Sequence, residues 1–373
     1  MLKAYRFKIY PTKSQKTRME RTLNLCRWVY NQTLALRKNA WVNESKSISK
    51  HETHNLLPTW KKDKPELKEV FSQVLQNVQA RVDLALKAFF GMVKAGEIPG
   101  YPRFRGKGRY DSFTYPQSGF SLKPGKLYLS KIGDIKIKVH RAIEGTVKTC
   151  TIRRMPTGKW FACFSVETDV PLPPKKEGPV VGIDVGLQRF ATLSNGEYID
   201  NHRFFRSEEK ELARVQRKLS KAPKGSFERK SALKVVESVH ERTANCRSDF
   251  VNKVSRDLVD RFGLIAFEDL DIRNMHQNHN LAKSISDVAW GMLVTATQSK
   301  AAYAGSEVVL VDPRNTSQVC SGCGLLVKKE LADRVHSCPG CGLDMDRDLN
   351  AALNILRLVL QSLGVGSRRS PGL

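Results

Sequence analysis

The sequence lacks a long apolar run, and this absence bears first on membranes. Its purely apolar stretches, such as 264–267 and 308–311, are only a few residues long, whereas a helix that spans a bilayer needs about 20 apolar residues. The first six residues alternate apolar and basic side chains and contain no apolar core of signal-peptide length. We therefore expect no membrane-spanning helix and no export, and we place the chain in the cytoplasm.

Nucleotide-binding fingerprints are missing as well. No GxGxxG segment follows a predicted strand, and there is no Walker-type phosphate loop. These absences argue against a small-molecule enzyme that uses such a fingerprint.

Cysteine is sparse outside one cluster, because four of the eight cysteines stand alone in the sequence. Isolated thiols of this kind fit a reducing compartment.

Acidic residues are too few to balance the basic ones. The chain has 63 Lys and Arg against 37 Asp and Glu, a formal net charge of +26. Residues 1–170 hold 33 basic and 13 acidic residues, whereas 171–373 hold 30 and 24. An excess this large opposes compaction unless a polyanion neutralises it. Nucleic acid is therefore the predicted partner, with anionic lipid and acidic proteins as weaker alternatives.

The first half predicts a sheet interrupted by helices. Residues 5–10 alternate with period two, as a strand does, and Pro11 ends them. Apolar residues at steps of three or four predict helices around 19–34 and 74–89, with irregular chain over 43–66 between them. Short alternating runs from residue 100 onward predict an antiparallel β-barrel or curled sheet, which the opening strand could complete.

The second half follows a proline-rich linker, 171–178, and predicts a mixed α/β domain. A buried strand over 180–186 opens a hairpin, and a helical hairpin follows over 207–222 and 226–262. Another strand ends at Glu268. A capping signature at Ser284 and Asp287 predicts a helix to about Gly305, followed by a strand over 307–311 and a closing helix from Asp348.

Four cysteines form the most specific motif. Cys320 and Cys323 make one CxxC pair and Cys338 and Cys341 a second, with a glycine after each pair. Four thiolates satisfy tetrahedral Zn²⁺ at about 2.3 Å, so the spacing predicts a zinc ribbon whose closed shell makes it structural. Four packed free thiols, the alternative, would not need the adjacent glycines and proline. We expect the nearby His336 to be a solvated loop residue.

Acidic residues also stand at predicted strand ends and at a helix start, namely Asp184, Glu268 and either Asp346 or Asp348. An acid within an apolar strand is costly unless it is paired or binds a cation. Each alone has a simpler explanation, as a turn residue, a solvated strand end or a helix cap. Together they predict a site for two Mg²⁺ ions roughly 4 Å apart, an arrangement suited to phosphodiester cleavage.

These motifs resemble those of the TnpB family, the RNA-guided nucleases of insertion sequences, and the resemblance covers nearly the whole chain. The segments that carry it are the four cysteines and RWVYN at 27–31, PGYPRF at 99–104, GIDVG at 182–186, FEDL at 267–270, SISD at 284–287 with WG at 290–291, and DRD at 346–348 with NAALNI at 350–355. Together these segments are specific to the family.

The resemblance implies a fold of the α/β plus β-barrel class. A RuvC-type, ribonuclease-H-like nuclease domain with an inserted zinc ribbon would follow a β-barrel wedge domain that carries a helical recognition insertion. The implied ranges are 1–10 and 97–170 for the wedge, 11–96 for the insertion, 171–178 for the linker, 179–317 and 344–362 for the nuclease domain, and 318–343 for the ribbon. Residues 363–373 are expected to be a disordered tail.

Carried over residue by residue, the resemblance makes Asp184, Glu268 and Asp348 the catalytic and Mg²⁺-binding acids. Asp346 is the alternative to Asp348, because the DRD repeat leaves the assignment ambiguous by two positions. The implied activity is DNA cleavage directed by a guide RNA from the transposon end, which pairs with double-stranded target DNA beside a short flanking motif. A monomer is expected, and an oligomer remains open.

Basic residues interleaved with aromatics predict the nucleic-acid contacts, through phosphates and base stacking. A helix with amide side chains is expected, from its family position, to read the flanking motif, since amides can pair with adenine edges. The residues concerned are Arg103, Arg105, Lys107, Arg109 and Tyr110 in the basic segment and Gln76 and Asn77 on the helix. For the aromatic residues, burial in the barrel core is the alternative.

Two other functions use the same features. Some relatives that have lost the acids act as RNA-guided repressors, so a silent regulator is one alternative, disfavoured here because all three acids are present. A ribonuclease-H-like triad also performs strand transfer, so a DNA transposase is the other.

Overall fold

The computed structural model describes residues 2–169, 171, 173–271, 289–330 and 333–364. The chain divides into two compact units, residues 1–170 and 171–373. The predicted capping signature at Ser284 and Asp287 lies outside the described residues. Within the described part of the chain, none of the helices is long and apolar enough to cross a membrane.

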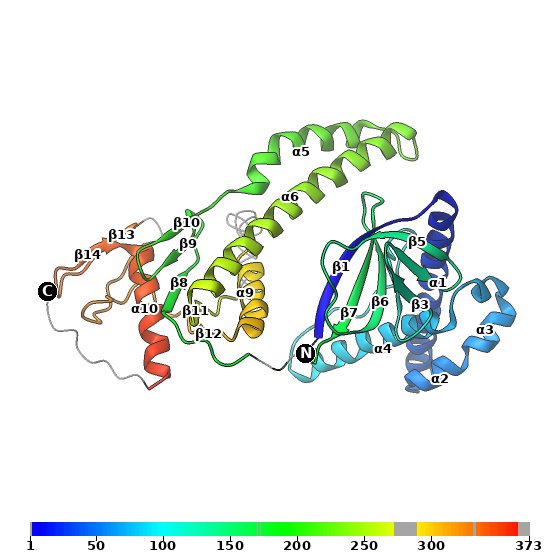
Figure 1. Ribbon diagram of the computed structural model, residues 1–373, viewed down its shortest axis with the longest axis horizontal. Helices are drawn as coiled ribbons and strands as arrows, with labels where there is room; N and C mark the ends of the chain where they lie inside the picture. The colour runs from blue at the N-terminus through cyan, green and yellow to red at the C-terminus, as the bar shows by residue number, and fades with distance from the viewer. Residues whose placement is uncertain (1, 170, 172, 272–288, 331–332, 365–373) are drawn as a thin grey trace. The chain divides into compact units, whose positions relative to one another are not determined.

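A seven-stranded antiparallel sheet forms the body of the first unit (Figure 1). Its strands are β1 (Leu2–Tyr10), β2 (Ser112–Tyr115), β3 (Phe120–Lys123), β4 (Lys126–Leu129), β5 (Gly133–Lys138), β6 (Thr146–Arg154) and β7 (Trp160–Glu167), in the order β2-β6-β7-β1-β5-β4-β3. The edge strands β2 and β3 are consecutive in sequence, and the rings of Tyr115 and Phe120 lie 6.4 Å apart. The sheet is therefore curled into a nearly closed barrel, as predicted, with the opening strand inside it.

Helices inserted after β1 cover this barrel. They are α1 (Lys13–Glu44), α2 (Lys50–Asn55), α3 (Leu57–Asp63), the 3₁₀ turn η1 (Pro65–Glu69) and α4 (Ser72–Lys94). The apolar faces of α1 and α4 share one buried cluster with the barrel strands. The expectation of irregular chain over 43–66 was wrong, because Ser49 and Glu52 form a capping box that starts α2.

The second unit is built on a five-stranded sheet. Its strands are β8 (Val180–Asp184), β9 (Arg189–Leu193), β10 (Tyr198–Asp200), β11 (Leu264–Glu268) and β12 (Glu307–Val311), in the order β10-β9-β8-β11-β12. The first three strands form an antiparallel meander, whereas β8, β11 and β12 run parallel. The long helical hairpin of α5 (Phe204–Lys221) and α6 (Phe227–Arg261) connects the meander to β11.

Helices cover both faces of this sheet (Figure 1). The helices α6 and α9 (Trp290–Ala304) pack on one face, where Val181 and Ile183 of β8 point, and α10 (Arg347–Ser362) packs on the other. A Cβ atom on Gly182 would lie 2.3 Å from the backbone oxygen of Ala352 in α10. Glycine at 182 is therefore what allows α10 to lie directly on β8. Between β12 and α10 the chain forms a small hairpin of β13 (Val335–Ser337) and β14 (Asp344–Asp346).

Candidate functional site

Two carboxylates meet at the ends of adjacent parallel strands. Asp184 is the last residue of β8 and Glu268 the last of β11, and the register pairs Ile183 with Phe267 one residue earlier. Because side chains alternate along a strand, the acids point to the face opposite that of Ile183 and Phe267, whose side chains belong to the cluster beneath α6 and α9. Both acids therefore lie on the α10 face of the sheet.

A third carboxylate is supplied by the first turn of α10. Asp348 lies in this turn, and one of its oxygens is 3.9 Å from where a Cβ atom of Gly186 would lie, just after β8. Its side chain is only 14% exposed and lies 3.4 Å from the guanidinium of Arg347. The close packing of α10 on β8 thus brings Asp348 to the strand end that carries Asp184.

The charges of these groups act on one another. Burial raises the pKa of Asp184 well above its ordinary value, and the negative charges of Glu268 and Asp348 raise it further, while Arg347 opposes them. Burial also raises the pKa of Glu268, and a hydrogen bond donated by the Thr316 hydroxyl lowers it. A cation among the three carboxylates would relieve this repulsion, so the donor set fits a hard divalent ion such as Mg²⁺.

Asp346 and Asp348 differ in what their oxygens contact. Asp346 is the N-cap of α10: its Oδ1 accepts hydrogen bonds from the backbone N–H groups of Asp348 and Leu349, at 2.9 and 3.1 Å. Its Oδ2 lies 3.2 Å from the guanidinium of Arg189. Both oxygens of Asp346 are therefore engaged, Oδ1 with the helix start and Oδ2 with Arg189 of β9. Asp348 is the acid of the two whose charge raises the pKa of Asp184 more.

Two buried asparagines fasten the segment before the cysteines to α10. Asn354 donates to the backbone oxygens of Thr316 and Val319, and Asn350 donates to Val319 and accepts from the N–H of Ser321. Both asparagines are almost fully buried. The loop that holds the Thr316 hydroxyl against Glu268 is therefore fixed to α10, the helix that also carries Asp348.

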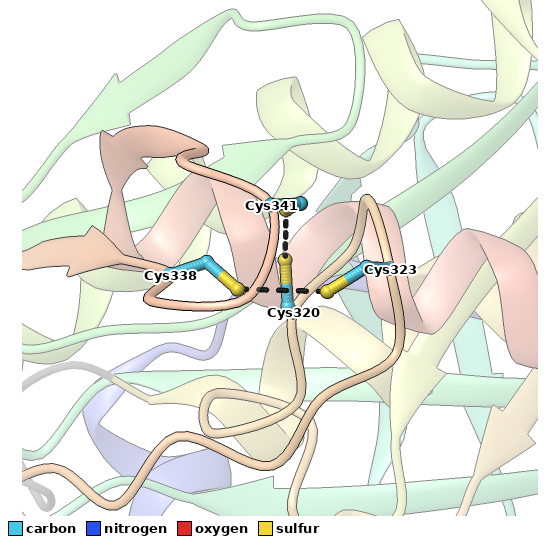
Figure 2. A group of neighbouring side chains, drawn as sticks. All are labelled: Cys320, Cys323, Cys338 and Cys341. Atoms are coloured by element: carbon cyan, nitrogen blue, oxygen red, sulfur yellow. Dashed lines mark hydrogen bonds between the residues drawn. The ribbon is translucent and has the colours of Figure 1, made fainter.

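The four predicted cysteines converge on one point (Figure 2). Their sulfur atoms all lie within 4.8 Å of one another, with 3.7 Å between Cys320 and Cys341 and 3.5 Å between Cys323 and Cys338. Sulfur atoms at about 2.3 Å from a tetrahedral Zn²⁺ are roughly 3.8 Å apart, so the cluster fits zinc. Among the described residues, it is the one group of His, Cys, Asp and Glu side chains this tight.

The two CxxC pairs have the same backbone form. In each, the first cysteine accepts a 2.9 Å bond from the glycine four residues later, Gly324 or Gly342. Both glycines have positive φ, 81° and 75°, which side chains disfavour. The expectation for His336 was wrong: it is fully buried and contacts Lys329, because β13 turns its side chain inward.

In the first unit, part of the predicted basic segment lines a pocket of about 230 Å³. Arg105 and Arg109 lie there with Arg81 of α4. The guanidinium of Arg105 lies over the ring of Tyr30, and that of Arg81 over the ring of Tyr110. The side chain of Asn31 fixes the backbone of Arg105 by two hydrogen bonds of 2.8 and 3.0 Å. The pocket also contains Asp111, whose carboxylate pairs with Arg153. Its surplus of guanidinium groups suits a phosphate.

The other predicted nucleic-acid contact residues differ in how far they are exposed. Arg103, Lys107 and Gln76 are exposed, while Asn77 is half-buried and accepts a 3.1 Å hydrogen bond from Arg81. Tyr110 is only 7% exposed, so its ring belongs to the core and offers no stacking surface. The alternative of core burial is the correct one for this tyrosine, because β2 begins just after it and draws it into the barrel.

Sequence reasoning missed Arg81, Thr316, Asn350 and Asn354. The signal for Arg81 was a cation flanked by Val78 and Val82 of the apolar series over 74–89, and its side chain donates to Ser112 and Thr114 of β2. Asn350 and Asn354 stand one turn apart on a helix that is otherwise apolar on its buried face. A buried amide at such a position indicates a backbone partner.

Three family models match the chain. One described as "Probable transposase" matches residues 163–279, "Cas12f1-like, TNB domain" matches 290–355, and "Helix-turn-helix domain" matches 1–46. The last description differs from the structure, in which this segment holds one strand, β1, and one continuous helix of 32 residues, α1.

Relatives match the chain along its whole length. A Streptomyces pristinaespiralis protein described as "Putative RNA-guided DNA endonuclease" is 36% identical, over 99% of this chain and 92% of its own. InsQ of Escherichia coli (strain K12), with the same description, is 30% identical over 95% and 92%. Cas12f1, solved with sgRNA and target DNA, shares the fold, with a TM-score of 0.58 at 17% identity, over 92% of this chain and 82% of that one. On these matches, the chain belongs to the TnpB family, as its motifs predict.

Proposed function

We propose that this protein is an RNA-guided, Mg²⁺-dependent DNA endonuclease. The observation that carries the proposal is the meeting of three carboxylates, from the ends of β8 and β11 and the start of α10, in a chain whose relatives are described as RNA-guided DNA endonucleases. The strand order β10-β9-β8-β11-β12 with helices on both faces supports a RuvC-type, ribonuclease-H-like nuclease domain.

In this proposal Asp184, Glu268 and Asp348 hold the magnesium ions. Bound Mg²⁺ supplies an activated water and stabilisation of the leaving oxygen, chemistry that a two-metal site provides. The chain's own contribution is to hold the carboxylates in place. Thr316 orients Glu268, and Asp346 fixes the helix start that presents Asp348.

The four cysteines would hold Zn²⁺ as a structural ion. Four sulfur ligands close the coordination shell, so no position is left for a substrate or a reactive water. The asparagine contacts of α10 to Thr316 and Ser321, on either side of Cys320, support a role in bracing the nuclease domain.

Guide RNA and double-stranded target DNA are the proposed partners. The basic excess of residues 1–170 and the arginine pocket of Arg81, Arg105 and Arg109 support phosphate contacts in this unit. Exposed Gln76 supports a role for the start of α4 in reading a flanking motif. We propose the wedge, insertion, linker, nuclease and ribbon ranges as the domains of the chain, with a monomer in the cytoplasm; residues 365–373 lie outside the described part of the chain.

Sequencing the RNA that stays bound tests the guided part of this proposal. The protein would be expressed with the DNA that flanks its gene and purified at high salt, which removes weak phosphate contacts. We expect one discrete RNA with a constant scaffold and a variable 3′ end. Heterogeneous fragments alone would contradict guidance, and joined transposon ends formed without RNA would indicate a transposase.

A further inference from the structure

The C-terminal ends of α1 and α4 enclose a second pocket in the first unit, which shares no lining residue with the arginine pocket. Its volume is about 450 Å³, within the range of small-ligand sites. Most of its wall is apolar, from Trp41 and Val42 of α1, Leu86, Phe89 and Phe90 of α4, and Tyr101 of the following loop. We call this the aromatic pocket.

Three of its rings contact one another, and Trp41 adds a fourth ring that faces solvent. The ring of Phe89 contacts those of Phe90 and Tyr101 edge-on, with centroids 5.2 and 5.3 Å apart. Yet Trp41 is 60% exposed and Phe90 50%. Neighbouring large apolar side chains left in water mark an interaction site more often than isolated ones do.

The charged side chains that line the pocket are all basic. Arg37, Lys38 and Lys46 line it, and none of its described lining residues is Asp or Glu. Arg37 is held by Asp83, 3.0 Å away, and so forms a fixed part of the wall. Lysine is depleted at protein–protein interfaces, whereas cations beside exposed rings are typical of surfaces that bind single-stranded nucleic acid.

We propose that the aromatic pocket binds one unstacked nucleobase of a single-stranded segment. The base stacks on Trp41, and its phosphates contact Lys38 and Lys46. A paired base cannot enter, because its faces are covered by neighbours in the duplex. This inference rests on the proposed function only in taking nucleic acid as the partner.

Binding of fluorescent 15-mers to the full-length protein tests it, with rU15 and dT15 as separate arms to distinguish RNA from DNA. We expect Trp41→Ala to weaken binding of at least one of them about tenfold, since stacking on an aromatic residue contributes about that much. Trp41→Phe should restore most of the affinity. Leu84→Ala is the control, because Leu84 is 65% exposed on α4 but does not line the pocket.

A 15-base-pair duplex supplies the second comparison, and Trp41→Ala should leave its affinity unchanged. Equal single-strand affinities of the Trp41→Ala and Leu84→Ala variants would overturn the inference. So would self-association that Trp41→Ala abolishes without changing oligonucleotide binding, since the pocket would then be a protein-docking face. The assay needs neither guide nor cleavage, so its result is separate from that of the proposed nuclease activity.

Discussion

Asp184 is the acid of the candidate site whose pKa is raised by both of the other two acids. Its carboxylate is buried, and the negative charges of Glu268 and Asp348 raise its pKa further. We predict that Asp184→Asn, which keeps the shape and removes the charge, lowers guided DNA cleavage at least about 100-fold, a loss of roughly 3 kcal/mol of transition-state stabilisation. Guide RNA binding should stay unchanged, as measured by filter binding. Loss of both together would show that the acid is structural.

The same residue predicts a pH dependence of stability. Its native pKa lies above the unfolded value of about 3.8, so folding favours the protonated acid. The stability that Asp184 contributes is fully present at pH values below the unfolded pKa of about 3.8, and it is lost as the pH rises through the native pKa. In magnesium-free buffer, Asp184→Asn should therefore be more stable than wild type to urea at neutral pH, by a margin that shrinks toward pH 4. A constant margin would contradict this.

From the hydrogen bond between Thr316 and Glu268 we predict that Thr316 affects the metal affinity of the site. Its hydroxyl donates to Glu268 and lowers the pKa of that carboxylate. Thr316→Val should raise the pKa and weaken Mg²⁺ binding about 10- to 100-fold, the usual cost of losing a partner of a metal ligand. Calorimetric titration of the RNA-free protein with Mg²⁺ measures this without cleavage. Thr316→Ser, which keeps the hydroxyl, should behave as wild type, and equal affinities for all three would exclude the role.

At the residue level, the sequence predicted which acids and cysteines lie near one another but not what each acid contacts. Spacing alone predicted the thiol cluster, because CxxC pairs constrain the chain locally. The choice between Asp346 and Asp348 depends on the N–H groups and on Arg189, which is distant in sequence. Burial of Tyr110 and His336 likewise depends on strands that the local pattern does not place.

Among the elements, the contact between α10 and β8 fixes the site. Gly182→Ala would place a Cβ atom against the backbone of α10, so we predict a loss of about 1–3 kcal/mol in the free energy of unfolding. Gly91→Ala is the control: a Cβ atom there meets nothing within 4 Å, and alanine should stabilise α4 by about 0.5–1 kcal/mol. Urea unfolding measures both, and equal shifts would refute the packing argument.

The proposed zinc ribbon is an element whose metal content can be counted directly. Cys320→Ser should lower zinc from one ion per chain toward none, by elemental analysis, and destabilise the second unit, since structural zinc binding contributes to folding. Cys246→Ser is the control, because Cys246 is exposed and outside the cluster. Full zinc content in Cys320→Ser would contradict the assignment.

Most elements followed from hydrophobic periodicity, and the exceptions have a physical cause. The strands β8 and β11 were predicted because buried parallel strands read as apolar runs, although β8 ends at Asp184, two residues before the predicted end. The two short helices α2 and α3 were missed because their residues are mostly polar. The curled sheet itself was predicted from its short alternating strands, whereas the ring contact between Tyr115 of β2 and Phe120 of β3 was not, because no local pattern contains it.

For the whole molecule, the central claim is that a guide RNA directs the carboxylates of the second unit to cut matched DNA. The most direct test is cleavage of a linear DNA that carries the guide's target beside a library of flanking sequences, with Mg²⁺ and the purified complex. We predict that the wild type cuts matched targets next to one short motif, and that Asp184→Asn, a mismatched guide or omission of Mg²⁺ abolishes the product. Equal cleavage of matched and mismatched targets, or full cleavage by Asp184→Asn, would contradict the account.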